Sequence, residues 1–266
     1  MKKLSATLLL MTTALLLNSF THHGNSPATG ELTIRFSHKA GDKDLKFDTT
    51  RYRNSSGEMF TVSRFQYFVS NIRLQKKDGS VFTVKQDSSY FLVNAEDPAS
   101  TSIHLKVPEG EYKSLEFIIG IDSIRNTVPI AKRNGILDPS TSMDNGMYWS
   151  WNSGYIFLKI EGESASAPAD PKGQKKFRYH IGGFGGYNAP TINNIKKVSL
   201  DITETGRIKV EKVKPASIHL VADILKVFTG KSEVSIHDHS SVMFSEYSVN
   251  IANNYSQMFY FKASNK

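Results

Sequence analysis

Short apolar or alternating runs, each broken by turn residues, fill most of this 266-residue chain. Residues 32–36 alternate with a period of two, and residues 60–74 are rich in aromatic and β-branched side chains. Such runs are typical of strands, whose side chains point alternately to two faces. The Asp78-Gly79 step before residues 81–84 predicts a hairpin. We therefore expect an all-β fold, an antiparallel β-sandwich with short helical additions.

The rest of the chain continues the same pattern. Three further strand pairs are predicted: 103–107 with 112–121, 155–160 with 175–181, and 197–202 with 207–210. Short helices are expected at residues 222–228 and, near the C-terminus, at residues 245–258, where apolar residues recur three or four apart. No internal repeat is present, so one domain is expected over residues 31–262.

The N-terminus has the parts of a secretory signal. Lys2 and Lys3 precede an apolar run at residues 4–17, and a polar stretch rich in small residues follows. The run has about 14 residues, whereas a membrane-spanning helix needs roughly 20. We expect a signal peptide at residues 1–20 and a flexible leader at residues 21–30. With no cysteine in the chain, there is no lipobox, and the expected location is periplasmic or secreted.

Composition excludes several classes of function. The formal net charge is +8, but the lysines are scattered, which argues against nucleic-acid binding. The absence of cysteine excludes thiolate metal sites and cysteine nucleophiles. No hydrolase or nucleotide-binding motif occurs, and no feature places the carboxylates Asp122 and Glu161 opposite each other as in a glycosidase. The glycine-rich segment 182–186 is expected to be a mobile loop.

Histidine, methionine and tryptophan remain as candidate ligands for a soft metal ion. His38 and His180 each stand near the end of a predicted strand, and His237-Asp238-His239 is a weaker candidate for a metal-binding pair. Trp149 and Trp151 lie among turn-forming residues, which places them at the edge of a loop. Met143 and Met147 are nearby and are possible thioether ligands.

Several ordered segments together are similar to one known family. They are Phe36-Ser37-His38, residues 65–72 (FQYFVSNI), residues 120–123 (GIDS), residues 147–155 (MYWSWNSGY), residues 179–183 (YHIGG) and residues 251–259 (IANNYSQMF). In this combination the chain resembles the MbnP-like family, exported bacterial copper-binding proteins of methanobactin operons. The W-x-W-x-x-G-Y and Y-x-S-N-I segments are the specific parts, and the resemblance spans nearly the whole mature chain.

The resemblance implies a β-sandwich with a mononuclear copper site, Cu(I) or Cu(II), and no enzymatic activity. The ligands it implies are two imidazoles, from His38 and His180, and an oxidised tryptophan, kynurenine. Trp149 is the favoured site of oxidation and Trp151 the alternative; we otherwise expect Trp151 to lie in the core. A MauG-like dihaem enzyme is implied as the catalyst of that oxidation, and copper acquisition, storage or homeostasis as the role.

A second hypothesis uses the same aromatic segment differently. Residues 147–155 would stack on a carbohydrate or a partner protein, as in an extracellular binding or adhesion module. The two hypotheses make different structural predictions. The copper site requires His38, His180 and one tryptophan to converge, whereas the binding module requires exposed tryptophans far from the histidines.

Overall fold

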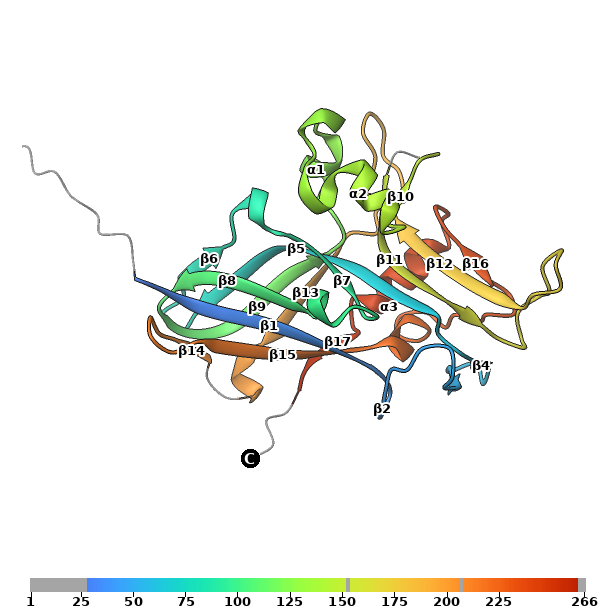
Figure 1. Ribbon diagram of the computed structural model, residues 1–266, viewed down its shortest axis with the longest axis horizontal. Coiled ribbons are helices and arrows are strands. Elements are labelled where there is room, and N and C mark those ends of the chain that lie inside the picture. The colour runs from blue at the N-terminus through green and yellow to red at the C-terminus, as the bar shows by residue number, and fades with distance from the viewer. Residues whose placement is uncertain (1–27, 152–153, 206–207, 263–266) are drawn as a thin grey trace, which may run out of the picture.

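The computed structural model describes residues 28–151, 154–205 and 208–262, arranged as two curled sheets with few helices (Figure 1). The predicted signal peptide and most of the predicted leader lie outside the described residues. The first strand already begins at Thr29, ahead of the expected domain start at Glu31. Within the described residues, no helix is both long and apolar enough to cross a membrane.

The smaller of the two sheets, called here the small sheet, is built around the first strand. Its members are β1 (Thr29–Ala40), β2 (Lys43–Asp44), β8 (Ser102–Pro108), β15 (Ala216–Asp223) and β17 (Phe259–Phe261). Strand β1 pairs antiparallel with β8 and parallel with β15. The parallel pair departs from the expected antiparallel sandwich. It is possible because a long stretch of chain separates β1 from β15.

The large sheet carries the remaining long strands, in the order β13-β9-β5-β11-β12-β16. These are β5 (Arg64–Lys76), β9 (Gly110–Ile119), β11 (Gly154–Glu163), β12 (Lys176–Gly182), β13 (Lys196–Asp201) and β16 (Ser241–Val242). Four shorter strands join it: β6 (Val81–Thr83), β7 (Tyr90–Asn94), β10 (Tyr148–Trp149) and β14 (Ile208–Val210). A separate hairpin consists of β3 (Tyr52–Arg53) and β4 (Met59–Phe60).

The two sheets pack face to face through aromatic side chains. The ring of Phe36 on β1 meets Tyr67 on β5 and Phe117 on β9, with centroids 6.0 Å and 6.4 Å apart. The ring centroid of Phe259 on β17 lies 5.5 Å from that of Tyr67. We call the side of the large sheet that carries Phe65 and Tyr67 its inner face, and the opposite side its outer face. This packing confirms the β-sandwich.

A cap of short helices covers one end of the outer face. It comprises α1 (Ser123–Thr127), η3 (Ile130–Lys132), η4 (Gly135–Leu137), α2 (Pro139–Asp144) and β10. Figure 1 shows α1 and α2 beside β10, on the side away from β1 and β15. An apolar cluster, called here the cap cluster, joins this cap (residues 121–149) to the sheet. In it Leu137, Met147 and Trp149 of the cap group with Phe68 and Phe157 of the sheet.

Two of the predicted hairpins are wrong. Strands β8 and β9 follow each other in the chain, but β8 pairs in the small sheet and β9 in the large one. Strands β13 and β14 both pair with β9, not with each other. A turn between two strands does not by itself make them pair, because each strand must also bury its apolar face. The pairs β5–β6 and β11–β12 are confirmed.

The remaining elements are short helices. They are η1 (Gln86–Ser88), η2 (Pro98–Thr101), η5 (Ile202–Thr205), η6 (Ile224–Val227) and α3 (Ser248–Tyr255). The predicted C-terminal helix is α3, and the predicted helix at 222–228 is the shorter η6, because Ala222 still belongs to β15.

The segment after β12 is not a loose loop. Phe184 bridges to Asn193, and the amides of Gly185 and Asn194 bond to Ile192 and Gly183. The Asn194 side chain donates to the carbonyl of Gly182, at 2.8 Å. Hydrogen bonds therefore tie this glycine-rich segment to residues 192–194.

Candidate metal centre

His38 lies on the inner face, inside the sandwich. Its Nε2 is 3.1 Å from the hydroxyl of Tyr67, and its ring meets Phe65 edge-on, with centroids 5.6 Å apart. Burial lowers the pKa of His38 to about 4. Burial also raises the pKa of Tyr67 well above its ordinary value. At neutral pH the two side chains are thus an uncharged pair within an aromatic core.

His180 points to the opposite face of the same sheet. In the strand register His180 stands beside Lys159, and Lys159 beside Gln66. Residues opposite one another in an antiparallel ladder share a face, and neighbours along a strand alternate. Since Phe65 and Tyr67 face inward, Gln66, Lys159 and His180 face outward. The structure therefore does not bring His38 and His180 together.

Glu161 holds the imidazole of His180 on this outer face. The Nε2–H group donates to Oε1 of Glu161, with the heavy atoms 2.6 Å apart. That hydrogen bond lowers the pKa of Glu161, against the opposing effect of its burial. The tautomer assigned from this contact leaves Nδ1 with a free lone pair, and no hydrogen bond from a described residue occupies it. A carboxylate on one ring nitrogen is the usual support of a metal-binding histidine.

Two further buried polar side chains complete the row. Lys159 is only 6% exposed, and its Nζ donates to the carbonyl oxygen of Gly146 in the cap. Gln66 is 2% exposed, and its Oε1 has no partner within the described chain. Buried polar atoms are rarely left unpaired. We call Gln66, Lys159, Glu161 and His180 the polar row.

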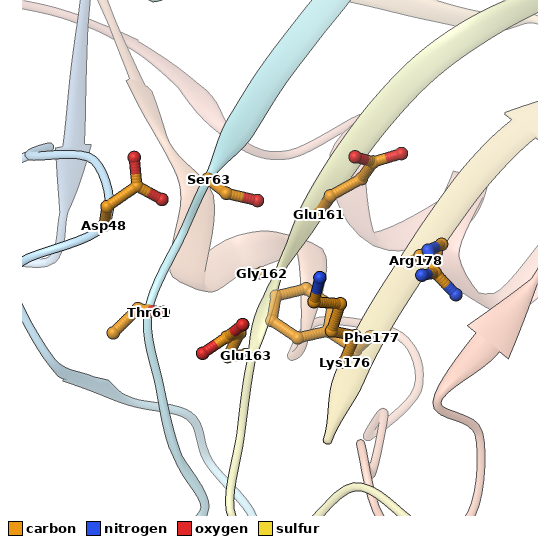
Figure 2. Close-up of a pocket in the computed structure, with 9 residues that line it drawn as sticks. All are labelled: Asp48, Thr61, Ser63, Glu161, Gly162, Glu163, Lys176, Phe177 and Arg178. Atoms are coloured by element: carbon orange, nitrogen blue, oxygen red, sulfur yellow. The ribbon is translucent and has the colours of Figure 1, made fainter. Parts of the chain in front are cut away.

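The polar row opens onto a pocket of about 430 Å³ beyond Glu161. Figure 2 shows the carboxylates of Asp48 and Glu161 on either side of Ser63, with Arg178 on the neighbouring strand. Oxygen atoms and cationic groups line this pocket, and it contains no sulfur or imidazole. Of the polar row, only Glu161 lines this pocket, which offers no donor suited to a soft metal ion.

Trp149 lies on the same face as His180. A Cβ atom placed on Gly182 would be 2.8 Å from Cζ3 of Trp149, so the indole covers Gly182. Gly182 follows His180 by two residues on one strand, which corresponds to about 6.6 Å. The indole is 5% exposed, and its Nε1 is buried without a partner among the described residues. Trp149 and His180 thus share one region of the outer face.

Trp151 is not part of the core. Its side chain is 64% exposed, although its ring lies 5.5 Å from that of Trp149. The expectation of a core position for Trp151 is wrong, because the chain leaves β10 after Trp149 and turns into solvent. The expected loop-edge position of the tryptophans is confirmed.

The other candidate ligands are dispersed. Met147 is fully buried in the cap cluster beside Trp149, whereas Met143 is 45% exposed on α2. Nδ1 of His237 bonds to Asp238, 2.9 Å away, and the ring of His239 stacks on Tyr247. Within the described residues, no three His, Cys, Asp or Glu side chains are grouped to hold a metal ion.

The ligand set implied by the resemblance therefore fits only in part. His38, His180 and Trp149 cannot bind one ion together in this structure, because the large sheet separates His38 from the other two. His180 and Trp149 lie on the same face, and among the described residues neither Nδ1 of the imidazole nor Nε1 of the indole has a hydrogen-bond partner.

Sequence reasoning missed the supporting residues. In the sequence Glu161 stands out only as a carboxylate that a glycosidase could use, and Lys159 and Gln66 carry no site motif. The pattern that could have found them is the segment Leu158-Lys159-Ile160-Glu161, where charged residues alternate with apolar ones in a buried strand. That alternation marks a polar outer face.

The fold is similar to that of a protein of known structure. MbnP from Methylosinus trichosporium superimposes with a TM-score of 0.54 and 18% sequence identity, over 82% of each chain. At this identity the likeness establishes the fold alone. No curated protein matches the chain. The family model described as MbnP matches residues 29–244, which is most of the sequence. The chain therefore belongs to the MbnP family.

Proposed function

We propose that this protein is an exported, non-enzymatic copper-binding member of its family, acting in copper acquisition, storage or homeostasis outside the cytoplasm. The observation that carries the proposal is the position of Trp149 and His180 on one face, each with a ring nitrogen that no described residue hydrogen-bonds. His38 is not part of this centre.

In the proposed centre, Nδ1 of His180 is one ligand and a nitrogen derived from Trp149 is the other. An intact indole N–H is only a donor, so Trp149 must first be oxidised to kynurenine, which exposes an aromatic amine. Both atoms of one dioxygen molecule add to C2 and C3 of the indole as the bond between these carbons breaks, and hydrolysis of the resulting N-formyl group releases C2 as formate. We assign this oxidation to a MauG-like dihaem partner enzyme in the same compartment.

The remaining residues of the site orient these ligands. Glu161 holds Nε2–H of His180 and so directs Nδ1 away from the carboxylate. Met147 is fully buried next to Trp149 in the cap cluster and is the accessory thioether candidate. Copper bound there would be a stored cargo held by soft and borderline nitrogen and sulfur donors.

Copper titration of the mature protein, purified after co-expression with a dihaem enzyme of this class, tests the proposal. We expect one saturable site, lost in His180→Ala and in Trp149→Phe, and weakened about 10- to 100-fold in Glu161→Gln. The variants His38→Gln and His104→Ala should bind like the wild type. Binding that is lost in His38→Gln but kept in His180→Ala would overturn the assignment. Mass spectrometry of the Trp149 peptide should show the gain of one oxygen and the loss of one carbon.

One observation supports the second candidate, a carbohydrate- or protein-binding module. A small cavity of about 210 Å³ lies beside Trp149 and is lined by the aromatic rings of Phe184, Tyr187 and Phe244. Tyr187 is 70% exposed and Trp151 64%. Quenching of tryptophan fluorescence by a saccharide, lost in Tyr187→Ala in protein that binds no copper, would favour this alternative.

A further inference from the structure

Lys159 is an unusual residue at its position in the sandwich. It lies in the middle of β11, between Gln66 and His180 in the ladder, and is only 6% exposed. Burying an ammonium group is unfavourable unless it is paired and hydrogen-bonded. An apolar side chain of similar length would fill the same space without that cost. The charge at residue 159 must therefore make an interaction that an apolar residue cannot make.

The ammonium reaches the cap at a single carbonyl group. Nζ of Lys159 donates to the oxygen of Gly146, in the turn between α2 and β10. Gly146 has a φ of +68°, and a Cβ atom there would lie 2.9 Å from Nζ, so the lysine approaches the bare backbone closely. The amides of Gly146 and Met147 are satisfied inside the cap, by Met143 and Ser142. Lys159 is therefore the side chain of the polar row that links the sheet to this turn.

The segment after Gly146 leads directly to the indole. The carbonyl of Met147 accepts from the amide of Ile156 at 2.9 Å, and Trp149 pairs with Gly154. Residues 146–149 are thus held at their start by Lys159 and further along by the β11 ladder. Trp149 is the last residue of this segment, and its indole lies over Gly182.

We propose that Lys159 is a positioning residue: by bonding to the Gly146 carbonyl, it fixes residues 146–149 so that Trp149 is buried beside His180. The placement is made by contacts within the protein and can be tested without copper. It deepens the proposed function, because the same contact would bring the oxidised Trp149 within reach of the imidazole.

The charges around Lys159 are consistent with this role. Burial lowers the pKa of Lys159, and the carboxylate of Glu161 on the same face raises it again. Arg64 is the other charged group acting on it, and it lowers the pKa. Glu161 therefore supports two groups of the polar row at once, the imidazole and the ammonium.

The chain contains two tryptophans, so Trp151→Phe leaves Trp149 as the only indole reporter. In that background, Lys159→Met should raise the acrylamide quenching constant of Trp149. The upper reference is the quenching constant of the exposed Trp151, measured in a Trp149→Phe protein. Lys159→Arg, which keeps the charge and the donors, should restore the shielding. Lys106→Met, an exposed strand lysine of the small sheet, should leave it unchanged. The proposal is overturned if Trp149 has the same quenching constant in Lys159→Met/Trp151→Phe as in Trp151→Phe alone.

Hydrogen exchange distinguishes a local effect from general instability. In Lys159→Met we expect the amides of Met147 and Ile156 to exchange faster, while Val69 in the centre of β5 keeps its protection. Equal acceleration at all three amides would mean that Lys159 stabilises the whole fold without positioning the cap, and would also overturn the proposal. Neither measurement involves copper, so both outcomes are independent of whether the protein binds the metal.

Discussion

At the scale of single residues, the two histidines that the family resemblance treats alike differ in every physical respect. His38 is enclosed by aromatic rings and bonded to a tyrosine, whereas His180 is held by a carboxylate and keeps a free nitrogen. Their strand positions decide this difference, because one faces into the sandwich and the other out of it. A buried neutral imidazole contributes to stability, and its effect on the fold should depend on pH.

We predict that acidification from pH 6.5 to pH 4 destabilises the protein through His38. Its pKa falls from 6.5 to about 4 on folding. The unfolded chain therefore binds a proton that the folded protein excludes, and stability decreases as pH falls across this interval. The decrease is at most about 3 kcal/mol. Urea unfolding at several pH values should show it in the wild type and in His104→Gln, but not in His38→Gln. An unchanged pH profile in His38→Gln would contradict the assignment.

At the scale of elements, the sequence locates the long strands but pairs only some of them correctly. The alternation of residues 32–36 and the apolar run of residues 155–160 are local features, and both segments are strands. The partner of a strand depends on which sheet buries its apolar face, and β8 and β9 show that two consecutive strands can be separated in this way. For the same reason the polar row could not be assembled from the sequence, since its members come from β5, β11 and β12.

The loop that carries His237 depends on a buried carboxylate from another element. Glu58, beside the β3–β4 hairpin, accepts from the amides of Ile236 and His237 at 2.7 Å and 2.8 Å, and from Asn54 at 2.6 Å. Burial raises the pKa of Glu58, but these hydrogen bonds outweigh it and hold the pKa below its ordinary value. The carboxylate therefore stabilises the folded protein only while it is ionised.

We predict that Glu58→Gln destabilises the protein at neutral pH by about 1.5–3 kcal/mol, because hydrogen bonds to a charged acceptor are lost. A depressed carboxylate pKa contributes stability that is present above 4.5 and disappears as pH falls through the folded pKa. Thermal unfolding should thus show that stability decreases less below pH 4.5 in Glu58→Gln than in the wild type. Glu163→Gln, at an exposed glutamate, is the matched control. Equal acid sensitivity in wild type and Glu58→Gln would refute the prediction.

At the scale of the whole molecule, stability and the candidate centre occupy different parts. The main core lies between the two sheets and includes His38 among its neighbours, whereas Trp149 belongs to the smaller cluster beneath the cap. In the sequence the two tryptophans occupy similar positions in one aromatic segment. Only the folded structure shows that Trp149 is buried and Trp151 is exposed. A cap held by a small cluster and by the Lys159 bond should open more easily than the sandwich beneath it.

We predict that the cap (residues 121–149) opens as a unit before the sandwich unfolds. Leu137, 3% exposed in the cap cluster, and Leu220, fully buried on β15, provide a matched pair of leucines. Truncating a buried leucine to alanine costs about 2–5 kcal/mol. If the cap opens separately, Leu137→Ala should speed hydrogen exchange in residues 121–149 and leave β1 and β15 protected. Leu220→Ala should instead lower the protection of both regions, because global unfolding also opens the cap. Loss of protection in β1 and β15 on Leu137→Ala would show that cap and sandwich unfold together, and that burial of Trp149 is inseparable from the stability of the whole fold.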